Sequence, residues 1–504
     1  MSTADRARCL PDTRLDIRPS VAEWASNPDG RNVLWISGPV GSGKSTVATS
    51  LYDFFMDISY LGAFLFFDSK SRYEPAILVS TLAHQLSHYD QRIRETIVSA
   101  VKLSEGTLRA RLQVQFDTFV FKPLQNAKLD LHHPILIIID GLDHCGDADS
   151  RRQLLEIFSN LPPSLRGLLR IVITSQPDPD VGDLLENFDT MELDTTSEVN
   201  QNDIRLYFEH EFEKLRKQKP RLGPKWPGAD RLSSLVERAG GLFLWSFVAA
   251  KHITPRNSDS RLDNLLKAPM ENVRLDDIYS ESLGTIDGWD DDEFVSEFKA
   301  VVGMIIVAGE PLSFETIDAL RGSEAQIPAD ETIPLLGSVL IFPTSISPHV
   351  PVRTLHSSFD DYLCDRQRCD EKWHIDIALH HETLALNCIS YLSRYFGVAD
   401  SANMSIGQPQ DGSTPEDFLQ KLREEELSIE ALTYAATFWP HHFCAVKEAH
   451  AEDTPILKSM DNFLRNNLLD WFELLSILKR SREASRMLKS VSRRLVSFSP
   501  ISLL

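Results

Sequence analysis

Cysteine is scarce in this sequence and follows no pattern of a metal or disulfide site. The six cysteines are scattered along the chain: Cys9, Cys145, Cys364, Cys369, Cys388 and Cys444. Their spacing includes no C-x-x-C pair, which argues against both a cysteine zinc site and a disulfide framework. The pattern is typical of the reduced thiols of an intracellular protein.

Long apolar runs, a signal peptide and an excess of basic residues are also missing. No apolar block is long enough to cross a bilayer, and residues 1–18 are polar and mixed in charge. These absences predict a cytoplasmic protein without a membrane span. The net charge of -21 and the pI near 5.2 argue against nucleic-acid binding, which needs a basic surface.

One stretch near the start of the chain matches the phosphate-binding pattern G-x-x-x-x-G-K-S. It runs through Gly38, Pro39, Val40, Gly41, Ser42, Gly43, Lys44, Ser45 and Thr46. An apolar run of strand type precedes it at 33–37, and a helical pattern without Gly or Pro follows at 46–55. Glycines let successive backbone N–H groups converge on phosphate oxygens at a helix N-terminus. The pattern predicts that Lys44 reaches the β- and γ-phosphates of a nucleotide and that the Ser45 hydroxyl holds Mg²⁺.

A second strong signal is an apolar run at 135–139 that ends in Asp140. A buried strand of this kind delivers a carboxylate to the C-terminal edge of a parallel sheet, where ligands gather. We expect Asp140 to hold Mg²⁺ through water and Asp143 to lie at the same edge, and both are candidate catalytic residues. The alternative is a core strand followed by a capping Asp and a turn. The phosphate loop upstream favours the magnesium interpretation.

An apolar run at 63–67, a strand pattern at 170–177 that ends in polar residues, and the segment 190–193 predict three more strands, with helices between them. This alternation predicts an α/β P-loop NTPase domain, a parallel sheet with helices on both faces. Beyond this domain the strand signals stop, and a helix, helix, hairpin order within 293–355 suggests a winged helix. The predicted parts are a polar lead-in at 1–29, the NTPase domain at 30–200, a helical domain at 201–290, a winged-helix domain at 291–370 and an α-helical tail at 371–504.

A family resemblance rests on five segments, at 34–46, 139–143, 171–175, 237–245 and 355–359. Together they resemble a fungal NACHT-type NTPase of the signal-transducing STAND class, related to the NOD-like receptors, with a nephrocystin-3-like N-terminal domain. The resemblance implies the strand order 2-3-4-1-5, and ATP rather than GTP, since no N-K-x-D motif accompanies the sheet. It also implies that ADP holds a closed monomer, which opens and oligomerises when ATP replaces ADP.

The resemblance carries two further expectations for single residues. It implies that His356 closes on the nucleotide phosphates. The alternative for His356 is a residue at a helix start that packs on its own domain. More loosely, the resemblance places Leu242 and Phe243 near the base of the nucleotide and the helical domain.

Two positions depart from the family pattern. His144 stands where relatives usually have Glu, and Gln176 stands where they usually have an Arg that senses the γ-phosphate. The missing guanidinium removes a cation from the charge that develops in phosphoryl transfer, a contribution that can be worth roughly 10³-fold or more. We therefore predict a switch or scaffold that binds ATP/ADP and Mg²⁺ with slow or absent hydrolysis, and self-association or protein partners through its helical regions. An actively turning-over ATPase and a nucleotide-free interaction scaffold are the alternatives.

The domain arrangement is short for the STAND class. Relatives usually carry an N-terminal effector and a C-terminal array of sensor repeats, whereas here the phosphate loop begins at residue 38. A truncated gene model, a regulatory short form, and a protein whose tail binds partners directly all fit this arrangement.

One histidine pair has a spacing that can hold zinc. His84 and His88 lie four residues apart on one face of a predicted helix. No Glu follows His84, and no third ligand is evident, so we do not predict a metal site there.

Overall fold

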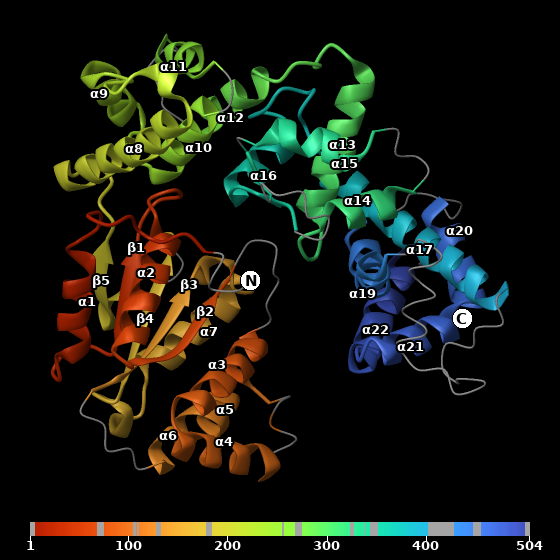
Figure 1. Ribbon diagram of the computed structural model, residues 1–504. Helices are drawn as coiled ribbons and strands as arrows, with labels where there is room; N and C mark the ends of the chain where they lie inside the picture. Colours follow the sequence, from red (N-terminus) through yellow and green to blue (C-terminus); the bar gives the residue numbers. More distant parts are fainter. Residues whose placement is uncertain are drawn as a thin grey trace. The chain divides into compact units, whose positions relative to one another are not determined.

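The computed structural model divides the chain into two compact units, Met1–Ile278 and Tyr279–Leu504 (Figure 1). The described residues are 6–67, 75–103, 107, 110–127, 133–177, 184–254, 257–267, 275–322, 327–337, 339–342, 351–401, 428–446 and 455–498. The finer division of the chain into five parts stays a prediction. Among the described residues, no helix combines the length and the apolar character that a membrane span requires.

The first unit is built on a parallel sheet of five strands. These are β1 (Val33–Ser37), β2 (Leu61–Phe66), β3 (Ile135–Asp140), β4 (Leu169–Ser175) and β5 (Asp189–Glu192). They lie in the order β2-β3-β4-β1-β5, which confirms the order that the family resemblance implied. The register brings Ser37 beside Ser175 and Asp140 beside Thr174. The C-terminal ends of β1, β3 and β4 therefore meet at one edge of the sheet.

Helices cover both faces of this sheet, because successive side chains along each strand point to opposite sides. Leu34 and Ile36 pack into a core with α1 (Ile17–Ser26) and α2 (Lys44–Asp57). Val33 and Trp35 pack into the core on the other face. That face is covered by α3 (Pro75–Tyr89), α4 (Gln91–Leu103), α5 (Leu112–Phe116), α6 (Lys122–Asn126) and α7 (Ala148–Ser159).

After the sheet, the first unit continues as helices. These are α8 (Glu198–Gln218), α9 (Ala229–Arg238), α10 (Phe243–Ile253), α11 (Ser258–Lys267) and the first turn of α12 (Leu275–Gly284). Gly240 and Gly241 separate α9 from α10, and both have positive φ angles, 54° and 81°. A Cβ on Gly241 would lie 1.9 Å from the carbonyl oxygen of Thr195, so the backbone passes there only as glycine.

The second unit begins with helices and one small hairpin. Its first elements are α13 (Asp292–Val307), α14 (Phe314–Arg321), α15 (Ala329–Thr332), β6 (Leu340–Ile341), β7 (Arg353–Thr354) and α16 (Ser357–Cys364). β6 and β7 pair antiparallel, as a wing would require. The tip of the expected wing, 343–350, lies outside the described residues, and the winged helix stays a prediction.

The tail of the chain is helical where it is described. It comprises α17 (Ile377–Ser401), α19 (Ile429–Ala445), α20 (Pro455–Asn466), α21 (Leu468–Ile477) and α22 (Ser481–Phe498). Trp439 and Trp471 are fully buried, and their ring centroids lie 5.2 Å apart. All six cysteines of the chain are free thiols.

Candidate functional site

The phosphate loop lies between β1 and α2, as the sequence predicts. Gly41 and Gly43 have φ angles of 80° and 96°, a left-handed conformation that glycine adopts without strain. These turns direct the chain into α2, which begins at Lys44. The first backbone N–H groups of a helix have no intrahelical partner, and the helix dipole is positive at this end. The loop can therefore donate to an anion.

Lys44 folds back over its own loop. Its Nζ donates to the carbonyl oxygens of Gly38 and Pro39 at 2.8 and 2.9 Å. Burial lowers the pKa of Lys44 below its ordinary value, while the carboxylates of Asp143 and Asp140 act in the opposite direction. A phosphate would replace these two neutral carbonyl acceptors with charged oxygens, which bind an ammonium more strongly.

Asp140 stands at the end of β3, where the sequence places it. Its side chain is 2% exposed, and Oδ1 accepts a hydrogen bond of 2.5 Å from Thr174 Oγ1. The backbone N–H of Gly141 also donates to Thr174, through the carbonyl oxygen at 3.0 Å and the hydroxyl at 3.2 Å. Strand β4 thus fixes the orientation of the carboxylate at the edge of the sheet.

Asp143 lies in a short turn after β3 and brings together the two positions that depart from the family pattern. Its Oδ2 accepts a hydrogen bond of 3.1 Å from Gln176 Nε2. The same oxygen lies 3.8 Å from His144 Nε2. Asp143 Oδ1 is buried and has no hydrogen-bond partner among the described residues. An acceptor oxygen is therefore available beside Lys44 and Asp140.

An arginine from the start of the chain holds the phosphate loop. Arg14 Nη2 donates to the carbonyl oxygen of Ser42 at 3.1 Å and to Asn200 Oδ1 at 2.6 Å. The guanidinium also lies 5.2 Å from the ring centroid of Phe243, within range of a cation–π contact. Arg14 has a φ angle of 53°, rare for a residue with a side chain, and its N–H is held by Asp203 Oδ2 at 3.1 Å.

The start of α10 closes on the loop from another side. Leu244 N donates to the carbonyl oxygen of Gly41 at 3.1 Å. A Cβ on Gly41 would lie 2.8 Å from the Cβ of Leu244. The segment after Gly241 therefore contacts the phosphate loop directly through Leu244, and Phe243 contacts Arg14, which binds the loop.

Arg6 forms an ion pair with the second carboxylate oxygen of Asp140. Its Nη2 donates to Asp140 Oδ2, and its Nε donates to Thr49 Oγ1 at 3.2 Å. The guanidinium lies 4.6 Å from the ring centroid of Phe66, and the Arg6 side chain is 12% exposed. The cation that balances Asp140 is thus an arginine of the N-terminal segment.

We expect Arg6→Ala to increase the affinity for Mg²⁺ in the presence of ADP. The substitution leaves Asp140 without its cation, so a divalent ion no longer competes with Arg6; a gain of roughly tenfold corresponds to about 1.4 kcal/mol. Mg²⁺ titration at fixed ADP measures the gain. Arg8→Ala is the matched control, since Arg8 belongs to the same segment and pairs with the surface residue Asp53 at 2.7 Å. Unchanged or weaker Mg²⁺ affinity in Arg6→Ala would mean that Arg6 supports the nucleotide instead.

The residues present fit a nucleotide with Mg²⁺. The loop offers backbone donors and an ammonium, and Ser42 Oγ is buried with no hydrogen-bond partner among the described residues. Ser45 is exposed at the start of α2, next to Lys44. Hydroxyl and carboxylate oxygens are ligands that Mg²⁺ prefers. Ser45 and Asp140 would hold the ion, directly or through water.

The structure brings Lys44, Asp140 and Asp143 of the first unit together, whereas His356 belongs to the second unit. His356 is the N-cap of α16, with an extended backbone. Its Nδ1 accepts a hydrogen bond of 3.1 Å from Ser358 N and lies 3.0 Å from Ser358 Oγ. Because Nδ1 accepts from the backbone, the neutral ring carries its proton on Nε2.

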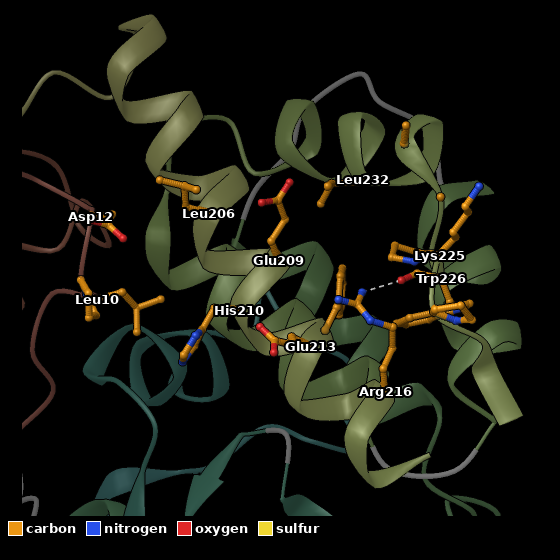
Figure 2. A pocket seen from close by; sticks show the side chains of 16 residues that line it. Leu10, Asp12, Leu206, Glu209, His210, Glu213, Arg216, Lys225, Trp226 and Leu232 are labelled. Atoms are coloured by element: carbon orange, nitrogen blue, oxygen red, sulfur yellow. Dashed lines mark hydrogen bonds between the residues drawn. The ribbon is translucent and has the colours of Figure 1, made fainter. Parts of the chain in front are cut away.

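A separate cavity of about 610 Å³ opens beside α8 (Figure 2). Glu209, Glu213 and Arg216 line it from the helix, and Arg216 Nη1 donates to the carbonyl oxygen of Trp226 at 2.7 Å. None of its lining residues belongs to the phosphate loop. This cavity is therefore separate from the candidate site at the phosphate loop and the sheet edge.

Sequence reasoning missed Arg6, Arg14, Asn200 and Leu244. Arg6 and Arg14 belong to a stretch that was interpreted only as a polar lead-in. Asn200 lies near the start of α8, 186 residues from the arginine that it contacts. The only sequence signal was the Gly-Gly-Leu-Phe-Leu segment, which the family resemblance placed loosely near the nucleotide base.

A protein-family model matches part of the first unit. Residues 16–176 match the family model described as Nephrocystin 3, N-terminal. The matched stretch contains the phosphate loop, Asp140, Asp143 and Gln176, and it confirms the resemblance of this part of the chain to a nephrocystin-3-like N-terminal domain. No curated protein matches the sequence.

Similarity to solved structures is weak. One is a STAND protein with a tetratricopeptide repeat sensor from Pyrococcus horikoshii, at a TM-score of 0.41 and 12% identity, covering 100% of this chain and 70% of that chain. Another is domain III of the replication initiation protein DnaA from Thermotoga maritima, at a TM-score of 0.28 and 13% identity, covering 52% of this chain and 95% of that chain. A third is Drosophila ORC bound to DNA, at a TM-score of 0.34 and 11% identity, covering 70% of this chain and 95% of that chain. TM-scores this low indicate neither a shared site nor a shared activity.

Proposed function

We propose that this protein, whose first unit carries a nephrocystin-3-like P-loop NTPase domain, is a nucleotide-dependent switch that binds ATP or ADP with Mg²⁺ and hydrolyses ATP slowly. The observation that carries the proposal is the arrangement of Lys44, Asp140 and Asp143 around a helix N-terminus. These groups suffice for binding: the loop amides and Lys44 hold the phosphates, and Ser45 with Asp140 holds the ion. The bound Mg²⁺ neutralises phosphate charge.

Slow hydrolysis follows from the groups around Asp143. Its carboxylate is held by the neutral amide of Gln176, where an arginine would place a cation near the γ-phosphate. His144 offers an imidazole in place of a second carboxylate. Phosphoryl transfer depends on positioning and on cations at the developing charge, so a site that binds phosphates without this cation is expected to retain its nucleotide.

The switch itself would couple the nucleotide to the helical parts of the chain. Leu244 at the start of α10 contacts the phosphate loop, and Phe243 contacts Arg14, so a change at the loop acts directly on this helix. His356, with its proton on Nε2, has a donor suited to a phosphate oxygen. We propose that this donor stabilises the closed ADP state, and that exchange for ATP favours self-association or binding of partner proteins.

We expect His356→Ala to release ADP roughly tenfold faster than the wild type. This factor corresponds to about 1.4 kcal/mol, the binding free energy lost with one hydrogen bond to a charged group. The rate of loss of a fluorescent ADP analogue measures this. His356→Asn separates the two possible roles, because asparagine is a good N-cap and keeps α16 capped but lacks Nε2. Fast release in both variants supports the phosphate contact. Wild-type release from His356→Asn would leave His356 as a capping residue only.

Binding and single-turnover hydrolysis measured on the same preparation test the proposal. The full chain should bind Mg-ATP tightly and convert it to ADP far more slowly than it binds. Rapid steady turnover that disappears in Lys44→Ala would identify an ATPase instead. Absence of Mg-ATP and Mg-ADP binding would leave an interaction scaffold without nucleotide.

A further inference from the structure

Three histidines of the second unit converge where α17 and α19 pack together. His381 comes from α17, and His441 and His442 are consecutive residues near the end of α19. One ring nitrogen from each lies within 4.8 Å of the others. The closest pair is His381 Nδ1 and His442 Nδ1, which lie 2.9 Å apart. Three imidazoles from two helices therefore present nitrogen atoms to a common point.

The ring of His442 is held in place from its other side. His442 is fully buried, and its Nε2 lies 2.8 Å from the hydroxyl of Tyr434. That hydroxyl accepts a hydrogen bond of 3.1 Å from the backbone N–H of Gly309. For Nδ1 to bind a metal, Nε2 must carry the ring proton and donate it to the Tyr434 hydroxyl oxygen, which leaves Nδ1 as the acceptor that faces His381. Histidine ligands of metal ions are commonly oriented in this way, with the second ring nitrogen bonded to an oxygen.

The three rings are also close enough to turn toward one point. The centroid of the His381 ring lies 5.7 Å from that of His441 and 5.2 Å from that of His442. Consecutive residues on a helix point about 100° apart, so a ligand from the neighbouring helix is needed to complete such a set. His381 contributes that ligand, and His441, which is not buried, leaves a path for an ion to enter.

We propose that His381, His441 and His442 form a site for a divalent transition metal of the zinc class, with water as the fourth ligand. Imidazole nitrogen suits zinc, copper and nickel, whereas magnesium and calcium prefer oxygen. Zinc–nitrogen bonds of about 2.0–2.1 Å at a tetrahedral angle separate the nitrogens by roughly 3.3 Å. The 2.9 Å pair and the 4.8 Å limit bracket this separation, so small side-chain rotations suffice.

The competing interpretation is a hydrogen-bonded cluster without a metal. Tyr434, His442 and His381 form a continuous chain of polar contacts, and a single proton between the two Nδ1 atoms satisfies the closest pair. In that case the chain of contacts does not require His441. The two interpretations differ in whether the set binds a metal and in whether His441 takes part.

The test is titration of the full chain, stripped with a chelator, with Zn²⁺ and separately with Co²⁺. His84→Ala/His88→Ala serves as the background, because that exposed pair sits four residues apart on α3 and can bind metal weakly by itself. On this background we expect one Zn²⁺ per chain by calorimetry, and visible absorption bands of tetrahedral Co²⁺. The bound Zn²⁺ should also raise the melting temperature, since it would link α17 to α19.

Three variants on the same background decide the outcome. His381→Ala and His441→Ala should each lose the Co²⁺ bands and weaken Zn²⁺ binding at least tenfold. Tyr434→Phe should weaken it by roughly 10–100-fold, because the positioning hydroxyl is lost while all three ligands remain. His442 is left unchanged, because its removal would open a cavity and strip Tyr434 of its partner. Equal Zn²⁺ affinity in the background protein and His441→Ala, or no Zn²⁺ binding by the background protein, would overturn the proposal.

Discussion

Lys44→Ala is expected to reduce the affinity for Mg-ADP on the order of 100-fold. The ammonium is the main cation of the phosphate loop, and its contacts to two phosphates are together worth about 3 kcal/mol at 1.4 kcal/mol per factor of ten. The same substitution should abolish the stabilisation by ligand, which for the wild type is about 2.7 kcal/mol at a nucleotide concentration 100 times the Kd. Calorimetric titration and thermal unfolding with and without Mg-ADP measure the two effects.

Lys251→Ala is the matched control for this prediction. Lys251 lies on α10 in the same unit, and its Nζ is 5.7 Å from the ring centroid of Phe247 rather than near the loop. It should leave the affinity for Mg-ADP and the thermal shift unchanged. Two results would contradict a nucleotide site at the loop. One is a wild-type melting temperature that does not change when Mg-ADP is added, and the other is a Lys44→Ala variant whose melting temperature rises with Mg-ADP as much as that of the wild type.

The double variant His144→Glu/Gln176→Arg is expected to raise the single-turnover rate of ATP hydrolysis by at least about tenfold. An arginine at the charge that develops on the phosphoryl group can contribute roughly 10³–10⁵-fold when its position is ideal. Gln176 already contacts Asp143, so a guanidinium at this position enters the same carboxylate cluster. The glutamate restores an acidic group beside Asp143. Rapid-quench measurement with excess protein gives the rate without product release.

Gln176→Lys is the control for the shape of the cation. It adds a positive charge but not the planar fork of arginine, and it should accelerate hydrolysis less than Gln176→Arg. Adding Lys44→Ala to the double variant should remove the gain. If the double variant binds Mg-ATP normally and hydrolyses it at the wild-type rate, the slow turnover has a cause other than these two positions.

The strands of the sheet, and the site residues at its C-terminal edge, were predictable from the sequence because buried strands have a distinct composition. Strands buried on both faces are mostly apolar, so β3 stands out as an unbroken run that ends in Asp140 and β4 as a shorter run within polar residues. The phosphate loop and Asp140 follow such strands directly, so their positions at the C-terminal edge follow from chain direction alone. The order of the strands came from the family resemblance, because apolar runs carry no information about which strands are neighbours.

The groups that hold the loop were not predictable, because they depend on contacts between distant segments. The pairing of Arg6 with Asp140 spans 134 residues, and that of Arg14 with Asn200 spans 186. A polar N-terminal stretch can be solvated as easily as it can fold onto a sheet, and nothing local distinguishes the two. The histidine cluster has the same character: His381 and His442 are 61 residues apart, whereas the spacing of His84 and His88 was visible in the sequence.

The most direct test of a nucleotide switch is to denature the purified full chain and identify the released nucleotide by chromatography. A site that binds tightly and hydrolyses slowly should retain its ligand through purification, so we predict close to one ADP per chain, and none from Lys44→Ala. A wild-type protein that releases no nucleotide and then fails to bind added Mg-ADP or Mg-ATP would contradict the account.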